Sequence, residues 1–434
     1  MVENSEQNMH NGSLVDYLAV VQFSGKQLLL KETQYMIDYF EDTYIGHLKS
    51  TKAESYQRTG NWTNKYIRKT YQSQIISYWG YADEEYDIVT KDGYILGLYR
   101  IPYGRTVNNK NLAQRVVVYL QHGLLTSASS WISNLPSNSL GFILSDAGYD
   151  VWMGNSRGNT WSRKHLYLEM NSKEFWAFSF NEMAKYDLPA STDFTVKQTR
   201  QEEIFYVGHS QGTTIGFITF STISKIAERI KIFFALTPVF STKYLKNPLI
   251  RTTYKWKSIV MAFYGNKDFL PKTSFKKFVG SKLCPLQIFD KICLNILFMM
   301  FGYDPKNLNM SRLDVYFSHN PAGTSAQNML HWSQLLNSTH LKAYDWGSPD
   351  LNLVHYNQTS ALYNVTNMNV ATAIWNGESD LLADPEDVNI LQSEITNHIY
   401  YKTISYYNHI DFLFGLDVYD QVYHEIIDII QDNL

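Results

Sequence analysis

One pentapeptide of this chain has the residue types and spacing of a turn that presents a nucleophile. Residues 208–212 read Gly-His-Ser-Gln-Gly, after an apolar run at 204–207 and before a small, apolar stretch from Thr213 onward. A serine in a sharp strand-to-helix turn needs glycines on both sides, because side chains there would collide with the neighbouring strand or helix. The spacing therefore predicts that Ser210 is a nucleophile. The amide of Gln211, which opens the helix, is predicted to stabilise an oxyanion beside it.

A second pentapeptide competes for this role. Residues 154–158 read Gly-Asn-Ser-Arg-Gly and also follow a predicted strand. The stretch after them, 159–164, is polar and irregular, whereas a helix buried on a sheet needs the small and apolar residues that follow Gly212. This difference favours Ser210 over Ser156 as the nucleophile.

A serine nucleophile needs a general base and a carboxylate that orients the base. Asp380 comes at the end of a predicted strand at 370–375, and His409 follows the last predicted strand, at 399–404. Both follow Ser210 along the chain, which is the order of acid and histidine in α/β hydrolases. We therefore predict Asp380 as the orienting acid and His409 as the general base.

Two further carboxylates lie near Asp380 in the sequence. Asp384 directly precedes Pro385, and this pair is typical of a helix N-terminus, where aspartate caps and proline opens the first turn. Glu378 is within reach of the same site, and a solvated loop residue is its alternative role. Asp380 remains the predicted acid.

A second oxyanion donor is predicted in the loop after the first predicted core strand, 116–120. This loop reads Gln-His-Gly-Leu-Leu at 121–125, and a turn at Gly123 would expose the backbone amide of Leu124. His122 is then a supporting or turn residue and not a catalyst.

These residues fall at the ends of a series of short apolar segments. Segments that read as strands lie at 116–120, 149–153, 204–207, 232–236, 370–375 and 399–404. Their alternation with helical stretches is typical of a mostly parallel sheet covered on both faces. Ahead of them, runs at 86–90 and 94–99 alternate across Asp92-Gly93, which predicts a β-hairpin.

One interval in this series is too long for a crossover. About 130 residues separate the strands that end near Leu236 and begin at Val370, against roughly 30 for a whole crossover unit. The interval therefore predicts an inserted subdomain. Because it leaves the carboxyl end of the sheet, where catalytic loops gather, we expect a cap or lid. A structural insertion with no gating role is the alternative.

Composition excludes several classes of protein. The chain has 434 residues, of which 44% are hydrophobic and 18% charged, as in globular proteins. Its formal net charge of -3, with no basic block interleaved with aromatics, argues against a nucleic-acid partner. The apolar stretch 292–301 is broken by Asn295 and is far shorter than the roughly 20 residues of a spanning helix. We expect no transmembrane segment.

The sequence signals for the cellular compartment disagree. Cys284 and Cys293 are either free core thiols or a pair that closes a small loop in an oxidising compartment. Six glycosylation sequons favour the oxidising compartment and begin at Asn11, Asn61, Asn309, Asn337, Asn357 and Asn364. The chain begins Met-Val-Glu-Asn-Ser-Glu, however, and its apolar run at 18–21 is shorter than the roughly 7–15 residues of a secretory signal core. The sequence thus predicts no signal peptide.

With these residues in place, the chain closely resembles the acid lipase family, which includes the gastric and lysosomal acid lipases. The resemblance runs from about Ser73 to the C-terminus and includes long motifs in the same order. These motifs lie at 73–76, 79–81, 120–125, 148–158, 208–214, 320–325, 380–385 and 407–412.

The resemblance implies an α/β-hydrolase fold with a mostly parallel central sheet. The core would comprise 67–240 and 366–434, with a helical cap and lid inserted at 241–365. Residues 1–66 are polar and irregular and match no part of the family, so disorder is one expectation for them. The family begins with a signal peptide, whereas none is predicted from this sequence, so the expectation of a secreted or lysosomal location rests on the resemblance.

The resemblance also implies roles for individual residues. It implies a triad of Ser210, Asp380 and His409, oxyanion amides from Leu124 and Gln211, a structural role for Ser156, and a disulfide between Cys284 and Cys293. It implies no cofactor and no metal. The chain departs from the family at Gly377-Glu378, where relatives have two glycines, and the added carboxylate is expected to alter pKa values near Asp380.

The resulting hypothesis is a serine ester hydrolase acting on neutral lipid esters, such as triacylglycerols or sterol esters, at a lipid–water interface. Catalysis would pass through an acyl-enzyme on Ser210. Two alternatives remain open. One is a small-ester esterase or acyltransferase of the same fold, and the other is a catalytically silent lipid-binding product.

Overall fold

The computed structural model describes most of the chain from residue 72 onward. The described residues are 72–105, 115–247, 250, 267–270, 290–304, 306–309, 312–336, 338–359 and 362–434. The predicted N-terminal segment 1–66 and Cys284 lie outside the described residues, as does the side chain of Cys293. The disulfide between Cys284 and Cys293 therefore stays a prediction.

Nine described strands form one sheet. Its order is β1-β2-β4-β3-β6-β7-β10-β11, with β5 paired to β2. The pairs from β4 to β11 are parallel, whereas β2 is antiparallel to β1, β4 and β5. The strands are β1 (Glu84–Val89), β2 (Tyr94–Ile101), β3 (Val117–Gln121), β4 (Asp150–Gly154), β5 (Lys164–His165), β6 (Ile204–His209), β7 (Ile230–Leu236), β10 (Ala371–Gly377) and β11 (His398–Ile404). The six predicted core strands and the hairpin are confirmed, with ends that differ by one or two residues.

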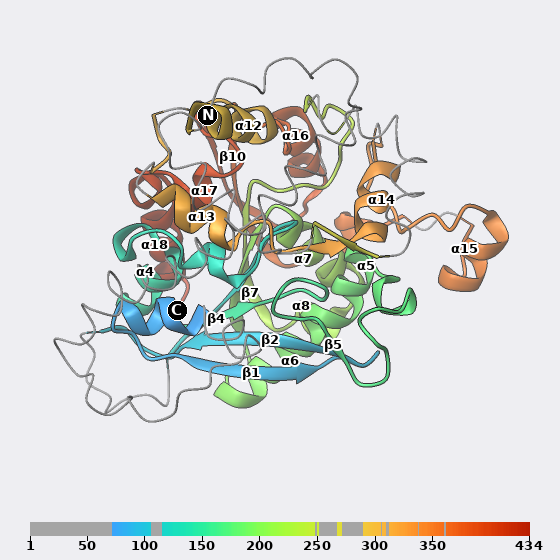
Figure 1. Ribbon diagram of the computed structural model, residues 1–434, viewed down its shortest axis with the longest axis horizontal. Helices are drawn as coiled ribbons and strands as arrows, with labels where there is room; N and C mark the ends of the chain where they lie inside the picture. The colour runs from blue at the N-terminus through green and yellow to red at the C-terminus, as the bar shows by residue number, and fades with distance from the viewer. Residues whose placement is uncertain are drawn as a thin grey trace, which may run out of the picture. The chain divides into compact units, whose positions relative to one another are not determined.

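Helices connect these strands in the order that the sequence pattern predicts. The helices are α4 (Leu140–Asp146), α5 (Phe180–Glu182), α6 (Leu188–Thr199), α7 (Gln211–Thr222), α8 (Ser224–Ala227), α16 (Pro385–Glu394), α17 (Asp411–Phe414) and α18 (His424–Asp432). Additional 3-10 and π helices lie at Ala128–Trp131, Pro136–Asn138, Glu174–Trp176, Met183–Asp187, Val365–Asn367 and Tyr419–Tyr423. Figure 1 shows the ribbon with its sheet and the helices around it.

Alternate residues of the central strands pack into two separate cores. Val118, Leu120, Phe205 and Val207 pack with residues of α4 and α18. Val117, Tyr119, Ile204 and Tyr206 pack with residues of α6, α7 and α16. Because successive side chains of a strand point to opposite faces, these two cores are the two faces of the sheet. Burial on both faces explains why residues 117–120 of β3 and 204–207 of β6 do not alternate between apolar and charged side chains.

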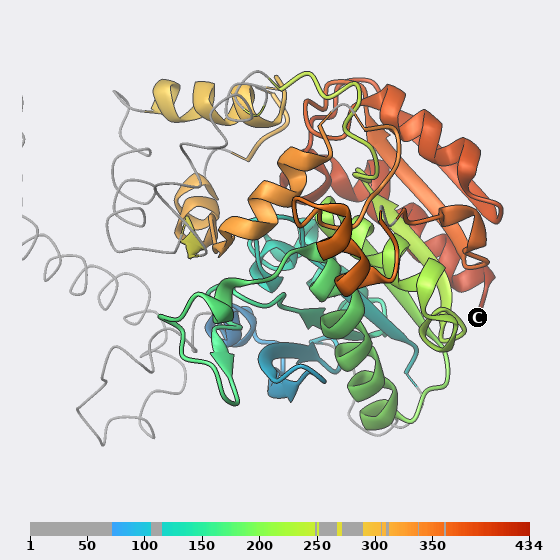
Figure 2. The ribbon, with the colours of Figure 1, turned by 90° about the vertical axis from the view of Figure 1, so that its right-hand side faces the viewer.

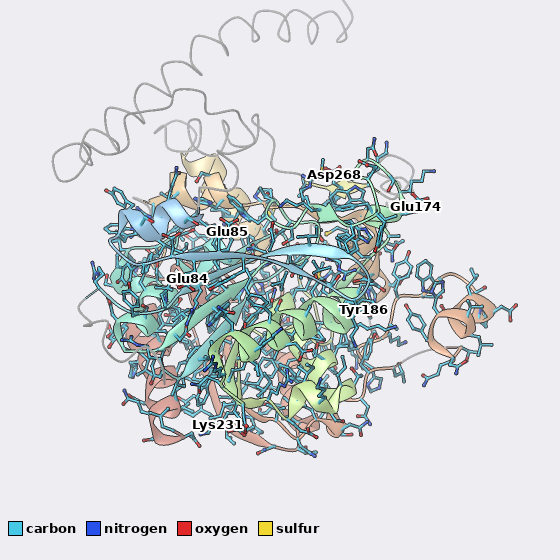
Figure 3. The ribbon with its side chains drawn as sticks, turned by 90° about the horizontal axis from the view of Figure 1, so that it is seen from below. Glu84, Glu85, Glu174, Tyr186, Lys231 and Asp268 are labelled. Carbon is cyan, nitrogen blue, oxygen red and sulfur yellow. The ribbon has the colours of Figure 1, made fainter. Side chains whose placement is uncertain are left out.

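The edge strand β1 is charged at its start. Glu84 and Glu85, labelled in Figure 3, open the strand, and Glu84 forms an ion pair of 2.8 Å with Arg100 of β2. Charged residues at an edge discourage pairing with another chain. The hairpin between the two strands turns at Gly93, whose φ of 95° favours glycine, as predicted for the Asp-Gly turn.

The long interval between β7 and β10 is inserted into this fold. Its described elements are β8 (Asp268–Phe269), α12 (Asp290–Phe301), α13 (Leu313–His319), β9 (Thr324–Ser325), α14 (Ala326–Gln334) and α15 (Pro349–Tyr356). Figure 2 shows α12 in gold and α13 and α14 in orange. An ion pair of 2.6 Å between Arg163 and Asp268, the latter labelled in Figure 3, joins β8 to the core. None of the helices in the described part of the chain is long and apolar enough to span a membrane.

Candidate active site

Ser210 lies in a sharp turn between β6 and α7. Its φ of 54° and ψ of -123° fall outside the regions that ordinary residues adopt. Such strain persists only where surrounding structure enforces it, and it is common at functional sites. Ser210 is 7% exposed, and its backbone N–H donates to Leu236 O at 3.1 Å, which joins the turn to β7.

The two glycines of the pentapeptide are required by close backbone contacts. A Cβ atom at Gly208 would lie 2.9 Å from the backbone of Gly212, and one at Gly212 would lie 2.4 Å from the carbonyl oxygen of Gln121. No side chain fits at either distance. The sequence-based reason for both glycines, collision with the neighbouring strand and helix, therefore matches the structure.

Three predicted residues that are far apart in the sequence form one hydrogen-bonded line. His409 Nε2 lies 2.8 Å from Ser210 Oγ, and His409 Nδ1 lies 2.8 Å from Asp380 Oδ2. An ionised carboxylate can only accept, so Nδ1 carries the ring proton and Nε2 is left to accept from the serine hydroxyl. His409 is 3% exposed and Asp380 is 2% exposed. This arrangement can remove a proton from Ser210 as it attacks.

Asp380 is held by donors on both of its carboxylate oxygens. Oδ1 accepts from the backbone N–H groups of Leu382 at 2.7 Å and Ala383 at 2.9 Å. Oδ2 accepts from His409 and from the hydroxyl of Thr237. The neighbouring Glu378 has an exposed side chain, so the alternative role of a solvated loop residue fits its position.

Asp384 caps α16, as the sequence predicts. Its Oδ1 accepts from the backbone N–H of Glu386 at 3.0 Å, and Pro385 is the first helical residue. A capping side chain satisfies an N–H group that has no acceptor within the helix. Asp384 therefore belongs to the helix end, and Asp380 is the carboxylate that reaches the histidine.

The two predicted oxyanion donors lie in the segments that adjoin Ser210. A Cβ atom added to Gly123 would lie 2.9 Å from Ser210 Cβ, so the loop that carries Leu124 packs directly against the serine. Gln211 is the first residue of α7, and amides of a first helical turn have no acceptor within the helix. Leu124 and Gln211 therefore both lie in backbone segments next to Ser210.

His122 connects this loop to the segment that carries Ser156. Its Nδ1–H donates to Gly123 O at 2.8 Å, and its Nε2 accepts from the backbone N–H of Ser156 at 3.0 Å. Burial lowers the pKa of His122 to about 4, so the ring is neutral at pH 7 and can accept through Nε2. These contacts fit the supporting role that the sequence predicts.

The competing pentapeptide 154–158 belongs to the core. Ser156 Oγ accepts from Gln121 Nε2 at 3.0 Å. Arg157 is 1% exposed and forms ion pairs with Asp92 at 2.6 Å and Asp187 at 2.7 Å. The neighbours of Ser156 thus bind it to the sheet, in keeping with the structural role that the resemblance implies.

Two residues at the site were not singled out from the sequence. Thr237 directly follows β7, and its hydroxyl contacts Asp380 and lies 3.2 Å from His409 Nδ1. His209 directly precedes Ser210, and its Nε2–H donates to the backbone oxygen of His409 at 3.0 Å. Burial, with repulsion from His409, lowers the pKa of His209 to about 3. The position of Thr237 at the carboxyl end of a strand is the signal that could have identified it.

The insertion contributes to the same site. The carbonyl oxygen of Phe301, at the end of α12, accepts from the backbone N–H groups of His409 at 3.2 Å and Leu381 at 3.3 Å. From α14, Asn328 Nδ2 and Trp332 Nε1 donate to Gln211 Oε1 at 2.9 Å and 2.7 Å. The inserted elements therefore contact both the loops that carry the acid and the base and the residue after the nucleophile.

Metal ligation finds no support among the described residues. There, no group of three or more His, Cys, Asp or Glu side chains is placed to hold an ion. The chemistry available at the site is that of the serine, the histidine, the carboxylate and backbone amides.

Comparison with known proteins identifies the family. The family model described as alpha/beta hydrolase fold matches residues 116–416, and the one described as partial alpha/beta-hydrolase lipase region matches 72–135. The chain is 94% identical over 363 residues to Lipase member J of Homo sapiens, covering 83% of this chain and 99% of that protein.

Other relatives carry names that state a substrate. Gastric triacylglycerol lipase of Homo sapiens is 56% identical over 362 residues, covering 83% of this chain and 91% of that protein. Lysosomal acid lipase/cholesteryl ester hydrolase of Macaca fascicularis is 52% identical over 360 residues, covering 83% of this chain and 90% of that protein. The chain therefore belongs to the acid lipase family, whose members are carboxylic ester hydrolases with an α/β-hydrolase fold.

Proposed function

We propose that this protein hydrolyses esters of neutral lipids through a covalent acyl-enzyme on Ser210. The observation that carries the proposal is the hydrogen-bonded line from Ser210 through His409 to Asp380 at a strained turn. Ser210 Oγ attacks the ester carbonyl carbon as its proton passes to His409 Nε2. Asp380 holds the ring tautomer and stabilises the charged imidazolium.

The same groups complete the cycle. The amides of Leu124 and Gln211 donate to the oxygen that becomes negative in the tetrahedral intermediate. His409 then returns the proton to the leaving alkoxide, and the acyl group remains on Ser210. A water molecule gives a proton to His409 Nε2 as its oxygen attacks the acyl carbon. The bond from the acyl carbon to Ser210 Oγ then breaks, His409 gives the proton to Oγ, and the fatty acid leaves.

The substrate class follows from the relatives and from the insertion. The names of two relatives specify triacylglycerol and cholesteryl ester. Residues 241–365 act as a cap and lid in this proposal, because α12 and α14 reach the catalytic loops and Gln211. An apolar stretch such as that of α12, which carries the ring of Phe301 stacked on His409 with centroids 6.2 Å apart, suits an acyl chain better than a polar ester.

A secreted or lysosomal location is part of the proposal. The printed names of the relatives include a gastric and a lysosomal lipase. Among the described sequons, Asn357 and Asn364 have exposed side chains, which glycosylation requires. A mobility shift of the natural protein after enzymatic removal of N-glycans would support this location, and an unshifted protein would contradict it.

A fluorophosphonate probe tests the nucleophile directly. We expect the wild-type chain to be labelled, Ser210→Ala to lose all labelling, and Ser156→Ala, which changes the competing serine, to keep it. An unlabelled wild type, or a labelled Ser210→Ala, would refute the proposal.

Rates on esters of different size test the substrate class. We expect emulsified long-chain triacylglycerol or cholesteryl ester to be hydrolysed by the wild type and not by Ser210→Ala. Hydrolysis of short soluble esters alone would instead identify a small-ester esterase, and labelling without any turnover would leave the lipase assignment unsupported.

A further inference from the structure

The hydroxyl of Thr237 contacts the catalytic acid and base but has no role in the proposed reaction. Thr237 lies immediately after β7, its side chain is buried, and its Oγ1 donates to Asp380 Oδ2. The same oxygen atom is 3.2 Å from His409 Nδ1. The Nδ1 to Asp380 Oδ2 distance is 2.8 Å, so Nδ1–H donates to the carboxylate and the threonine hydroxyl is the second donor to Oδ2.

The backbone around Thr237 is held in an unusual conformation. Its φ of 45° is rare for a β-branched residue, and it precedes Pro238, which disfavours helical backbone. Its N–H donates to Trp375 O of β10 at 2.7 Å, and Thr213 Oγ1 of α7 accepts from Val239 N at 3.2 Å. The loop is therefore fixed on two sides, and this strained geometry directs the hydroxyl to the acid.

With Thr237, the acceptor positions of Asp380 are filled. Two backbone amides bind Oδ1, and His409 and Thr237 bind Oδ2. Asp380 has no exposed side-chain surface, so a missing donor could not be replaced by bulk water. A hydroxyl that donates to a carboxylate also spreads its negative charge and weakens its hold on the neighbouring imidazolium.

We propose that Thr237 is a positioning residue of the catalytic site, which fixes the orientation of Asp380 and moderates the strength of its hydrogen bond to His409. The inference rests on the proposed serine esterase function. It assigns to Thr237 no contact with the substrate.

Other ionisable groups lie near the pair. Burial lowers the pKa of His209, from β6, to about 3, and raises the pKa of Asp411, from α17, to about 8. Asp304 and Asp417 lie beyond Asp411, and Glu378 is exposed in the loop before Asp380. All of these groups stay unchanged in the variants of Thr237, so a difference in the acidic limb between variants reports the loss of the hydroxyl.

The test is the pH dependence of kcat/KM on a soluble p-nitrophenyl ester for Thr237→Val in the full chain. Valine keeps the branched shape at φ 45° and removes the hydroxyl. We expect the midpoint of the acidic limb to move to higher pH by about 0.5–1 unit. Without the threonine donor, the carboxylate of Asp380 stabilises the charged imidazolium of His409 more strongly, so the ring loses its proton at a higher pH. We expect kcat on the plateau to fall about 3- to 10-fold with KM little changed.

Two controls and one substitute variant make the outcome decisive. Thr237→Ser restores the hydroxyl, and should restore both the limb and kcat. Thr372→Val removes another buried hydroxyl, which bonds Val370 O at 2.8 Å in β10, and should move neither. If Thr237→Val does not fold, Thr237→Ala carries the same prediction.

An acidic limb that stays in place in the folded hydroxyl-free variant, or Thr237→Ser behaving like Thr237→Val, would overturn the inference. If only this inference fails, the wild-type chain is still labelled by the fluorophosphonate. If the proposed function fails, the wild-type chain is not labelled. The two failures are therefore separate.

Discussion

At the scale of single residues, the site depends on which nitrogen of His409 carries a proton. Asp380 Oδ2, 2.8 Å from Nδ1, keeps the proton on that nitrogen and leaves Nε2 free to accept from Ser210. An amide at position 380 could present its NH₂ group to Nδ1 and favour the wrong tautomer. Catalysis therefore depends on the carboxylate as a group that only accepts hydrogen bonds, and not merely on the shape of the side chain.

We expect Asp380→Asn to lower kcat on the order of 10³- to 10⁴-fold while the thermal unfolding midpoint changes little, because the side chains have the same shape. Glu378→Gln is the matched control, since it makes the same chemical change to an exposed side chain two residues away. Steady-state rates on a soluble ester measure both. Equal losses in the two variants would contradict the assignment of Asp380 as the acid.

At the scale of secondary-structure elements, α14 of the insertion is bonded to the start of α7. Gln211 is 2% exposed, and its Oε1 accepts from Asn328 and Trp332. Ser325 caps α14 by accepting from the N–H of Asn328 at 2.9 Å, which fixes that end of the helix. We infer that α14 holds the side chain of Gln211 away from the space beside Ser210, where its amide is proposed to bind the oxyanion.

Replacing Trp332 by Phe removes one donor to Gln211 and keeps most of the ring. We expect Trp332→Phe to lower kcat about 2- to 5-fold, since one neutral hydrogen bond contributes about 1 kcal/mol. Trp346→Phe also removes an indole N–H from the insertion, one that donates to Tyr356 at 3.1 Å, and should leave kcat unchanged. The reaction rate with a fluorophosphonate is a second measure, and equal rates in the two variants would exclude the link through α14.

At the scale of the whole molecule, folding brings carboxylates from distant parts of the chain close to Asp411. Burial, with repulsion from Asp304 of the insertion and from Asp417 and Asp380, raises the pKa of Asp411 to about 8. The folded protein therefore keeps a proton on Asp411 at pH 7, whereas the unfolded chain, with an ordinary pKa of 3.8, releases it. Between pH 4 and 8 this group makes the free energy of unfolding fall as pH rises.

Asn at position 411 has no proton to lose, so Asp411→Asn should remove this pH dependence. We expect the variant to be more stable than wild type at pH 7.5, by about 2 kcal/mol, and the difference to shrink toward pH 4.5. Urea unfolding at the two pH values measures it. Asp420→Asn, at an exposed position in the same region, should show no such trend. A difference for Asp411→Asn that is constant with pH would contradict the raised pKa.

Much of the fold and the core of the candidate site could be predicted from local sequence. The predicted strands at 204–207 and 370–375 begin within one residue of β6 and β10, because runs of apolar residues bounded by glycines and polar loops have few alternatives in a parallel sheet. The stretches that follow Ser210 and Ser156 distinguish the two serines, and α7 begins at Gln211 as predicted.

The sequence by itself therefore determined the α/β order, the turn at Ser210 and the positions of Asp380 and His409 after their strands, since these follow from short-range pattern and chain order. Only the tertiary structure decided that Thr237 reaches Asp380, that α14 reaches Gln211 and that Asp411 is kept neutral. Each of these depends on side chains that are more than 100 positions apart in sequence or on burial by several segments. Such contacts leave no periodic or spaced signal, because folding alone brings the groups together.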